Sequence, residues 1–260
     1  MKLSLALSGG AARGAFHVGV IAALEKHNIT IAAVSGTSIG AVIAAGVGSG
    51  TSAFDMIRLF KSKAFRKVFC FNYFYKGVFR INEQAAILRE IAPIDRLEKM
   101  HIPTFLTCVD VHSGEIVRFC QGDTIKLAMA SSALVPIFRP IRYENYLLID
   151  GGFMDNLPVE PLLAFDYPLI SVNLFPSSGS TKKRGLLSTW KRAMFLSIFA
   201  SSKLQIHQSD VCISSPELNH FGMFTFSELM RCFELGYAKG SETILTFMAQ
   251  KSIIDTSLNE

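Results

Sequence analysis

The chain has 260 residues, of which 50% are hydrophobic and 18% are charged. These values exclude a mainly disordered protein, and 19 glycines and five cysteines exclude collagen-like and disulfide-scaffold proteins. The net charge of +5 is localised, because residues 56–82 hold seven Lys or Arg and residues 167–209 hold six, with no acid in either segment. Clusters of this kind typically face an anionic partner.

The cysteines and the first residues indicate the cellular compartment. An odd number of cysteines without C-x-x-C spacing suits a reducing environment and argues against zinc, so we expect neither a metal nor another cofactor. The apolar residues after Met1-Lys2 are too few for a signal peptide, and no segment of 18 uncharged apolar residues could span a membrane. The expected location is the cytoplasm, with peripheral membrane contact; secretion as an effector without a signal peptide stays open.

Taken in chain order, the first half alternates strands with helices, which predicts the α/β class with a mainly parallel central sheet. No repeat or clear linker interrupts the chain, so we expect a single domain over residues 1–260. Its motif-bearing core covers 2–175, a lid-like loop covers 176–185, and a helical C-terminal part covers 186–251. The expected strands are 2–7, 31–35, 104–111, 115–119, 146–149 and 169–174, and the expected helices are 15–27, 39–48, 52–66, 83–91, 94–100, 123–132, 186–205 and 227–250.

The strongest chemical signal is the pentapeptide Gly36-Thr37-Ser38-Ile39-Gly40, between a short apolar strand and an Ala/Val-rich helix. A serine on such a turn exposes its hydroxyl at the edge of the sheet, and small neighbours let the turn close. The N-terminus of the following helix favours the negative charge that develops when serine attacks. This context predicts that Ser38 is a nucleophile.

A second turn, from Ser8 to Gly14, also joins a strand to a helix, and its glycines allow backbone N–H groups to converge on an anion. Either a phosphate loop or an oxyanion hole fits this pattern. The dinucleotide fingerprint would need glycine at Ala11 and an acid about 20 residues on, and the Walker lysine is absent. An oxyanion hole has the better reason to accompany Ser38, since acyl transfer needs donors for the tetrahedral oxygen.

A base for Ser38 has to come from an acid or a histidine. Asp150-Gly151-Gly152 places an acid at a strand end before two small residues, which makes Asp150 the candidate. Of the six histidines, only His207 and His220 follow that acid in the chain order of a conventional triad, and neither has a defensible strand-end context.

These three motifs in this order resemble the patatin-like phospholipase family, in its bacterial form. The stretches 130–138 and 150–159 resemble it too, and the similarity covers about residues 2–175. The resemblance implies a three-layer α/β/α fold and a Ser–Asp dyad without histidine, in which Ser38 is the nucleophile and Asp150 the base. It places Gly9, Gly10, Ala11 and Arg13 in the oxyanion segment, with Gly14, Gly36, Gly40, Gly151 and Gly152 as supporting motif residues.

The family usually has a third glycine where Ala11 stands. Because the hole uses backbone N–H groups, alanine is compatible with it if its φ angle is negative. The dyad also requires Asp150 to be partly desolvated beside Ser38, since a carboxylate of ordinary pKa is a poor base for a hydroxyl. Attack would then produce an acyl-serine that water hydrolyses.

Aromatic and basic residues alternate over 60–79, a composition that anionic lipid surfaces attract. A partly buried helix with a basic rim is the alternative, and nothing supports a nucleic-acid partner. The stretch 186–204 could rest on a membrane or cover the acyl site, although core packing explains its apolar face as well. The aromatic residues of the first segment are Phe60, Phe65, Phe69, Phe71, Tyr73, Phe74, Tyr75 and Phe79.

The sequence therefore predicts a serine acyl hydrolase that cleaves fatty-acyl esters of phospholipids or lysophospholipids without a cofactor. Two alternatives remain: an esterase or thioesterase acting on soluble acyl substrates, and a non-catalytic lipid- or nucleotide-binding module that uses the Gly9–Gly14 turn. The residues do not indicate an oligomeric state.

Overall fold

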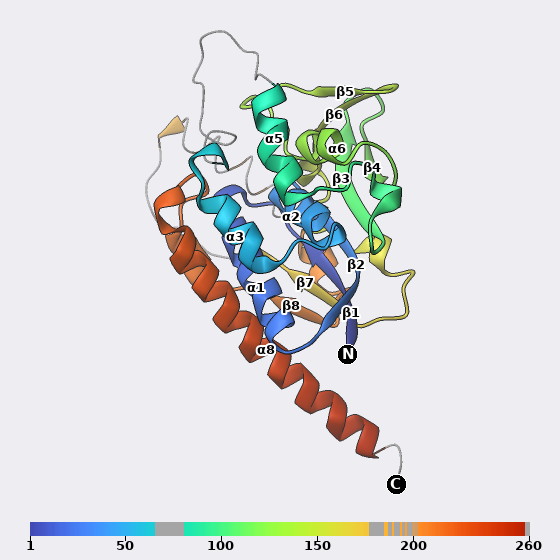
Figure 1. Cartoon of the computed structure of the whole chain (residues 1–260), viewed down its shortest axis with the longest axis vertical. Helices are drawn as coiled ribbons and strands as arrows, with labels where there is room; N and C mark the ends of the chain where they lie inside the picture. Colours follow the sequence, from blue (N-terminus) through green and yellow to red (C-terminus); the bar gives the residue numbers. More distant parts are fainter. Residues whose placement is uncertain are drawn as a thin grey trace.

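A computed structural model describes residues 1–65, 81–176 and 202–257, with six single positions between 185 and 200. In this part of the chain an eight-stranded sheet has the order β5-β6-β3-β2-β1-β7-β8, and β4 pairs with β3 (Figure 1). The strands are β1 (Lys2–Leu7), β2 (Thr30–Thr37), β3 (Thr104–Asp110), β4 (Glu115–Phe119), β5 (Ile141–Tyr143), β6 (Tyr146–Asp150), β7 (Leu169–Val172) and β8 (Val211–Ile213).

The strands at the centre of the sheet are parallel. β1 pairs in parallel with β2 and β7, β2 with β3, and β7 with β8, whereas β4, β6 and β5 form an antiparallel end. The predicted α/β class with a mainly parallel sheet is therefore confirmed. The described α-helices are α1 (Gly14–Lys26), α2 (Ile39–Gly48), α3 (Ala53–Lys61), α5 (Ile81–Ile91), α6 (Thr124–Ser131) and α8 (Leu229–Ser257).

Both faces of the sheet are covered. Leu3, Leu5 and Leu7 of β1 point into the larger core beneath the helices, while Ala6 belongs to a second core on the opposite face, as the two-residue period of a strand requires. The second core contains Leu157, Leu162 and Leu169 and is bordered by Ile206. Two cores on two faces give the three-layer α/β/α arrangement.

The long helix α8 crosses α1 at close range and projects beyond the rest of the domain (Figure 1). Glycines make the crossing possible: a Cβ at Gly19 would lie 2.1 Å from the carbonyl oxygen of Phe233, and one at Gly236 would lie 2.2 Å from that of Phe16. In the described part of the chain, no helix is both long enough and apolar enough to cross a bilayer.

Most predicted elements lie where the sequence indicated, with four differences. The helix expected over 52–66 is interrupted at Ser62, and the one expected over 94–100 is a single 3-10 turn, Leu97–Lys99. β7 ends at Val172, not at residue 174, and the three-residue strands β5 and β8 were not predicted. Residues 177–184 of the lid-like loop predicted over 176–185 lie outside the described residues, as does most of the helix predicted over 186–205.

Candidate active site

Ser38 occupies the single residue between β2 and α2, with φ 56° and ψ −123°. The strand–turn–helix context that the sequence predicts is present. A Cβ at Gly36 would lie 2.2 Å from the Gly40 carbonyl oxygen, and one at Gly40 would lie 2.3 Å from the Leu7 carbonyl oxygen, so only glycine fits either position. The Ser38 N–H donates to Ser131 Oγ at 2.9 Å, which fixes the turn against the end of α6.

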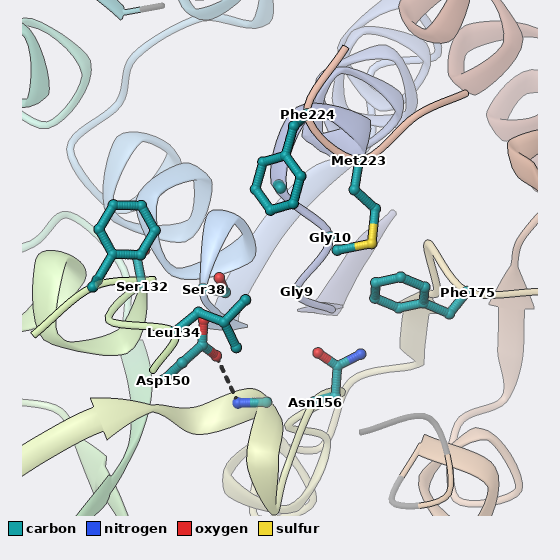
Figure 2. Close-up of a pocket in the computed structure, with 13 residues that line it drawn as sticks. Gly9, Gly10, Ser38, Ser132, Leu134, Asp150, Asn156, Phe175, Met223 and Phe224 are labelled. Carbon is teal, nitrogen blue, oxygen red and sulfur yellow. Dashed lines mark hydrogen bonds between the residues drawn. The ribbon is translucent and has the colours of Figure 1, made fainter. Parts of the chain in front are cut away.

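Asp150 ends β6 and is 4% exposed. Its Oδ1 accepts a hydrogen bond of 2.8 Å from the Gly152 N–H, and Ser38 lies beside the carboxylate in the same pocket (Figure 2). Burial raises the pKa of Asp150 from 3.8 to about 6, while the hydrogen bonds from Gly152 and Ser38 oppose the shift. Gly151 allows the end of β6 to pack closely against β3, because a Cβ at this position would lie 2.4 Å from the Thr107 carbonyl oxygen. The result is a buried carboxyl group with a raised pKa beside the serine.

The turn after β1 also faces this pocket. Three of its N–H groups are engaged: Gly9 donates to the Asn156 carbonyl at 3.1 Å, Ala12 to the Met223 carbonyl at 2.7 Å, and Arg13 to the Gly10 carbonyl at 3.2 Å. Among the described residues, the N–H groups of Gly10 and Ala11 have no hydrogen-bond partner, and both residues line the pocket with Ser38. They are the two backbone donors left for an anionic oxygen.

Ala11 does not have the negative φ angle that the sequence analysis required of an alanine. Its φ is 50°, in the left-handed region that glycine adopts at little cost. Gly10, with φ 157°, packs so closely on Leu174 that a Cβ there would lie 2.5 Å from Leu174 Cδ1. The turn thus has the conformation expected of consecutive glycines and holds an alanine within it.

The side chain of Arg13 is directed away from Ser38. Its Nε donates to the Phe221 carbonyl at 3.0 Å, one terminal nitrogen donates to the Leu174 carbonyl at 3.1 Å, and its guanidinium lies over the Phe175 ring. Arg13 does not line the pocket. The arginine of the glycine turn therefore joins β1 to two segments from the C-terminal third of the chain.

Asp155 lies behind the site, in the run that begins with Asp150. It is fully buried, forms an ion pair with Arg118 at 2.8 Å, and accepts a hydrogen bond of 2.5 Å from Gln205 Nε2. Burial raises its pKa, and Arg118 opposes that shift. Its carbonyl accepts from the Thr37 hydroxyl at 2.8 Å, so the segment after β6 is fixed directly against the residue that precedes Ser38.

None of the six histidines, all of which are described, lines the pocket. His207 and His220 are exposed. His17 is fully buried, its Nε2 lies 2.8 Å from the Ser8 carbonyl oxygen, and burial lowers its pKa to about 4. The conventional triad that the sequence left open has no histidine within reach. In the described part of the chain, no cluster of three or more His, Cys, Asp or Glu could hold a metal ion.

The pocket around Ser38 encloses about 520 Å³, its open mouth included. Apart from Ser38, Asp150, Ser132 and Asn156, its lining side chains are apolar. The sequence analysis did not single out Phe175, Met223 or Phe224, since they belong to no motif. The apolar lining residues are Leu134, Phe138, Phe175, Met223 and Phe224 (Figure 2).

A family model described as patatin-like phospholipase matches residues 5–163. The chain belongs to the patatin-like phospholipase family. The patatin match contains Ser38, Asp150 and the Gly9–Gly14 turn, and it ends before Phe175, Met223 and Phe224.

Individual relatives agree with this membership. An uncharacterized NTE family protein of Mycobacterium bovis is 30% identical over 177 residues, which cover 66% of this chain and 49% of that protein. Lysophospholipase NTE1 of Mycosarcoma maydis is 31% identical over 180 residues, which cover 63% of this chain and 9% of that protein. This patatin-like chain therefore spans about half the length of the first relative and about a tenth of the second.

Among solved structures, VipD from Legionella pneumophila has a TM-score of 0.54 with this chain at 14% sequence identity. The alignment covers 94% of this chain and 67% of that one, and it is a likeness of fold alone.

Proposed function

We propose that this protein is a serine hydrolase that cleaves carboxylic ester bonds of phospholipids or lysophospholipids through a Ser38–Asp150 dyad. One observation carries the proposal: Ser38, on a nucleophile turn, shares a pocket with the buried carboxyl group of Asp150, whose pKa is raised to about 6. The position of this pair beside the unpaired N–H groups of Gly10 and Ala11 supports acyl transfer.

In the proposed reaction, Ser38 Oγ attacks the acyl carbonyl carbon while Asp150 accepts the hydroxyl proton. The carbonyl oxygen becomes an oxyanion stabilised by the N–H groups of Gly10 and Ala11. Asp150 then gives its proton to the departing alcohol, which leaves an acyl-serine. A water molecule attacks that ester, Asp150 takes the water's proton, and the proton returns to Ser38 as the fatty acid leaves.

A lipid substrate is favoured over a small soluble ester by the apolar pocket and by the name of the lysophospholipase relative. Peripheral contact with an anionic membrane is supported by Phe54, which is 73% exposed, and by the exposed Lys61 and Lys63 near it in sequence. Phe60 and Phe65, in contrast, are buried and stack on each other, so these two belong to the core. The other aromatic residues proposed for the membrane surface, between 69 and 79, lie outside the described residues.

Fatty-acid release from anionic phospholipid or lysophospholipid vesicles tests the proposal. Ser38→Ala and Asp150→Asn are each expected to reduce kcat by at least about a thousandfold, which is about 4 kcal/mol of barrier. Intact folding of both variants, checked by circular dichroism, is the control. A rate near wild type for Asp150→Asn would contradict the dyad.

The two alternatives predict other behaviour. A hydrolase of soluble esters or thioesters would show no rise in rate when its substrate forms a lipid–water interface. A binding module would bind vesicles in both wild type and Ser38→Ala and would release no fatty acid in either case.

A further inference from the structure

The apolar lining of the pocket comes from two separate parts of the chain. Leu134 and Phe138, the 134–138 wall, lie in the loop after α6 and within the family match. Phe175, Met223 and Phe224, the C-terminal wall, lie beyond that match, at the end of β7 and in the loop between two 3-10 turns. Figure 2 shows Leu134 beside Ser38 and Asp150, and Met223 and Phe175 farther off, beyond Gly9 and Gly10.

Backbone contacts fix the C-terminal wall to the turn that holds the unpaired N–H groups. The Ala12 N–H donates to the Met223 carbonyl at 2.7 Å, and Arg13 Nε donates to the Phe221 carbonyl at 3.0 Å. Arg13 also donates a hydrogen bond to the carbonyl oxygen of Leu174, which precedes Phe175. The position of Met223 and Phe224 is thereby coupled to that of Gly10 and Ala11.

The 134–138 wall is fixed instead to the backbone of Asp150. The Asp150 N–H donates to the Ala133 carbonyl at 3.1 Å, and Leu134 follows directly. In Figure 2, Leu134 lies with Asp150, whereas Met223 and Phe175 lie on the side of Gly10. The two walls therefore adjoin two different chemical groups of the site.

This difference assigns the walls to different parts of an ester. In the tetrahedral intermediate the reacting carbon bears Ser38 Oγ, the oxyanion, the departing alcohol and the acyl chain. The alcohol receives its proton from Asp150, so it must lie within hydrogen-bond reach of that carboxyl group. With the oxyanion at the N–H groups of Gly10 and Ala11, the acyl chain extends away from Asp150.

We propose that the C-terminal wall binds the acyl chain and that Met223 and Phe224 determine which chain lengths the enzyme prefers; this inference rests on the proposed function. The 134–138 wall then borders the alcohol, which in a lysophospholipid carries the phosphate headgroup. Chain-length selectivity is thus set by residues outside the segment that defines the family, while the reaction uses residues inside it.

A series of p-nitrophenyl esters with acyl chains of four to twelve carbons, at a fixed detergent ratio, tests the assignment. Each fully buried methylene contributes about a fourfold gain in kcat/KM, so we expect wild type to gain about two- to fourfold per methylene until the wall is filled. The double variant Met223→Ala/Phe224→Ala is expected to gain less than about 1.5-fold per methylene.

Leu134→Ala is the matched control, because it shortens an apolar side chain on the other wall. We expect it to keep the wild-type gain per methylene and to change the ratio of rates between p-nitrophenyl and methyl esters of one acid. Labelling of Ser38 by a methyl fluorophosphonate, which has no long chain, reports an intact nucleophile in every variant. Met223→Trp, which fills the wall, supplies a second readout: the twelve-carbon ester should lose at least about tenfold relative to the four-carbon ester.

The outcomes separate the two proposals. An active wild type whose gain per methylene is unchanged in the double variant, or is lost in Leu134→Ala, overturns the assignment of the walls and leaves the proposed function intact. A wild type that hydrolyses none of the esters overturns the proposed function and the assignment with it.

Discussion

The turns after β1 and β2 share an unusual backbone conformation but hold different residues. Each holds one non-glycine residue in the left-handed region, Ala11 at φ 50° and Ser38 at φ 56°, at the end of one of two adjacent parallel strands. A left-handed L-residue costs about 1–2 kcal/mol. At Ser38 the side chain supplies the hydroxyl, whereas at Ala11 the backbone N–H is the useful group and the methyl adds nothing to the chemistry. The backbone strain at Ser38 therefore serves the proposed chemistry, whereas the strain at Ala11 could be removed without loss of a functional group.

The two turns also pack directly against each other. The missing side chain of Gly40 leaves room for the carbonyl oxygens of Leu7 and Ser8, and the missing side chain of Gly14 leaves room for Ile39. Neither turn can therefore move without displacing the other.

The largest effect is expected from the substitution Gly40→Ala, which disrupts both turns. In Gly40→Ala the new Cβ would lie 2.3 Å from the Leu7 carbonyl oxygen and 2.7 Å from that of Ser8, and backbone atoms in a sheet cannot yield. We expect the free energy of unfolding to fall by about 3 kcal/mol or more, together with loss of ester hydrolysis. Chemical denaturation measures the first quantity.

Gly46→Ala, later on α2, is the control for that experiment. Its Cβ would lie 3.0 Å from the flexible Met56 sulfur and 3.2 Å from Cγ2 and the carbonyl oxygen of Ile91, a much milder contact than at Gly40, and alanine gains about 1 kcal/mol of helix propensity over glycine. A change within about 1 kcal/mol is expected. If both variants lost equal stability, the clash between the two turns would not be the cause.

An effect of similar size comes from the charge of Asp150, which lies beside Ser38 in the turn after β2. The folded state raises the pKa of Asp150 from 3.8 to about 6, so it favours the neutral carboxyl group. The contribution of Asp150 to the free energy of unfolding is therefore greatest below pH 4 and falls by about 3 kcal/mol as the pH rises through 6. The difference in unfolding free energy between wild type and Asp150→Asn, measured from pH 4 to 7, should follow this fall.

Activity runs in the opposite direction, because the base must be ionised. Wild-type kcat/KM should rise about tenfold per pH unit below 6 and become constant above about 7. Ala11→Gly should leave that midpoint unchanged. A midpoint that moved in Ala11→Gly would mean that the turn after β1 influences the ionisation of Asp150.

The smallest expected effect removes the strain that serves no chemistry. Ala11→Gly should raise the free energy of unfolding by about 1 kcal/mol and leave kcat within about threefold, because the N–H group remains in place. Ala12→Gly, one residue along and without a positive φ, should instead lower stability by about 1 kcal/mol. Thermal or denaturant unfolding of the pair decides, and a loss at both positions would show that φ at Ala11 costs little.

Local signals predict much of this molecule from its sequence. Hydrophobic periodicity and glycine spacing locate β1, β2 and α2, and they place Ser38 between strand and helix because the turn requires glycine on both sides. The strand end at Asp150 and its two glycines can be identified in the same way. In each case the cause lies within a few residues of its effect.

The features that the sequence does not predict depend on distant neighbours. The positive φ of Ala11 occurs in a turn whose preceding residue, Gly10, packs on Leu174, a residue far away in the chain. β5 and β8, with three residues each, are too short for a period to show. Met223 and Phe224 reach Ser38 because Ala12 and Arg13 hold their loop, and nothing in the loop's own residues indicates a pocket wall.

The pairing of β7 with the edge strand β8 limits how this chain can be divided. A fragment ending at Phe175 would retain every motif, yet it would lack β8 and expose the outer edge of β7, whose four residues are all buried in the whole chain. It would also uncover the face of α1 on which α8 packs. Bare strand edges and apolar faces promote aggregation. We therefore expect the unit that folds to be larger than the segment that matches the family, and an expressed fragment to need α8.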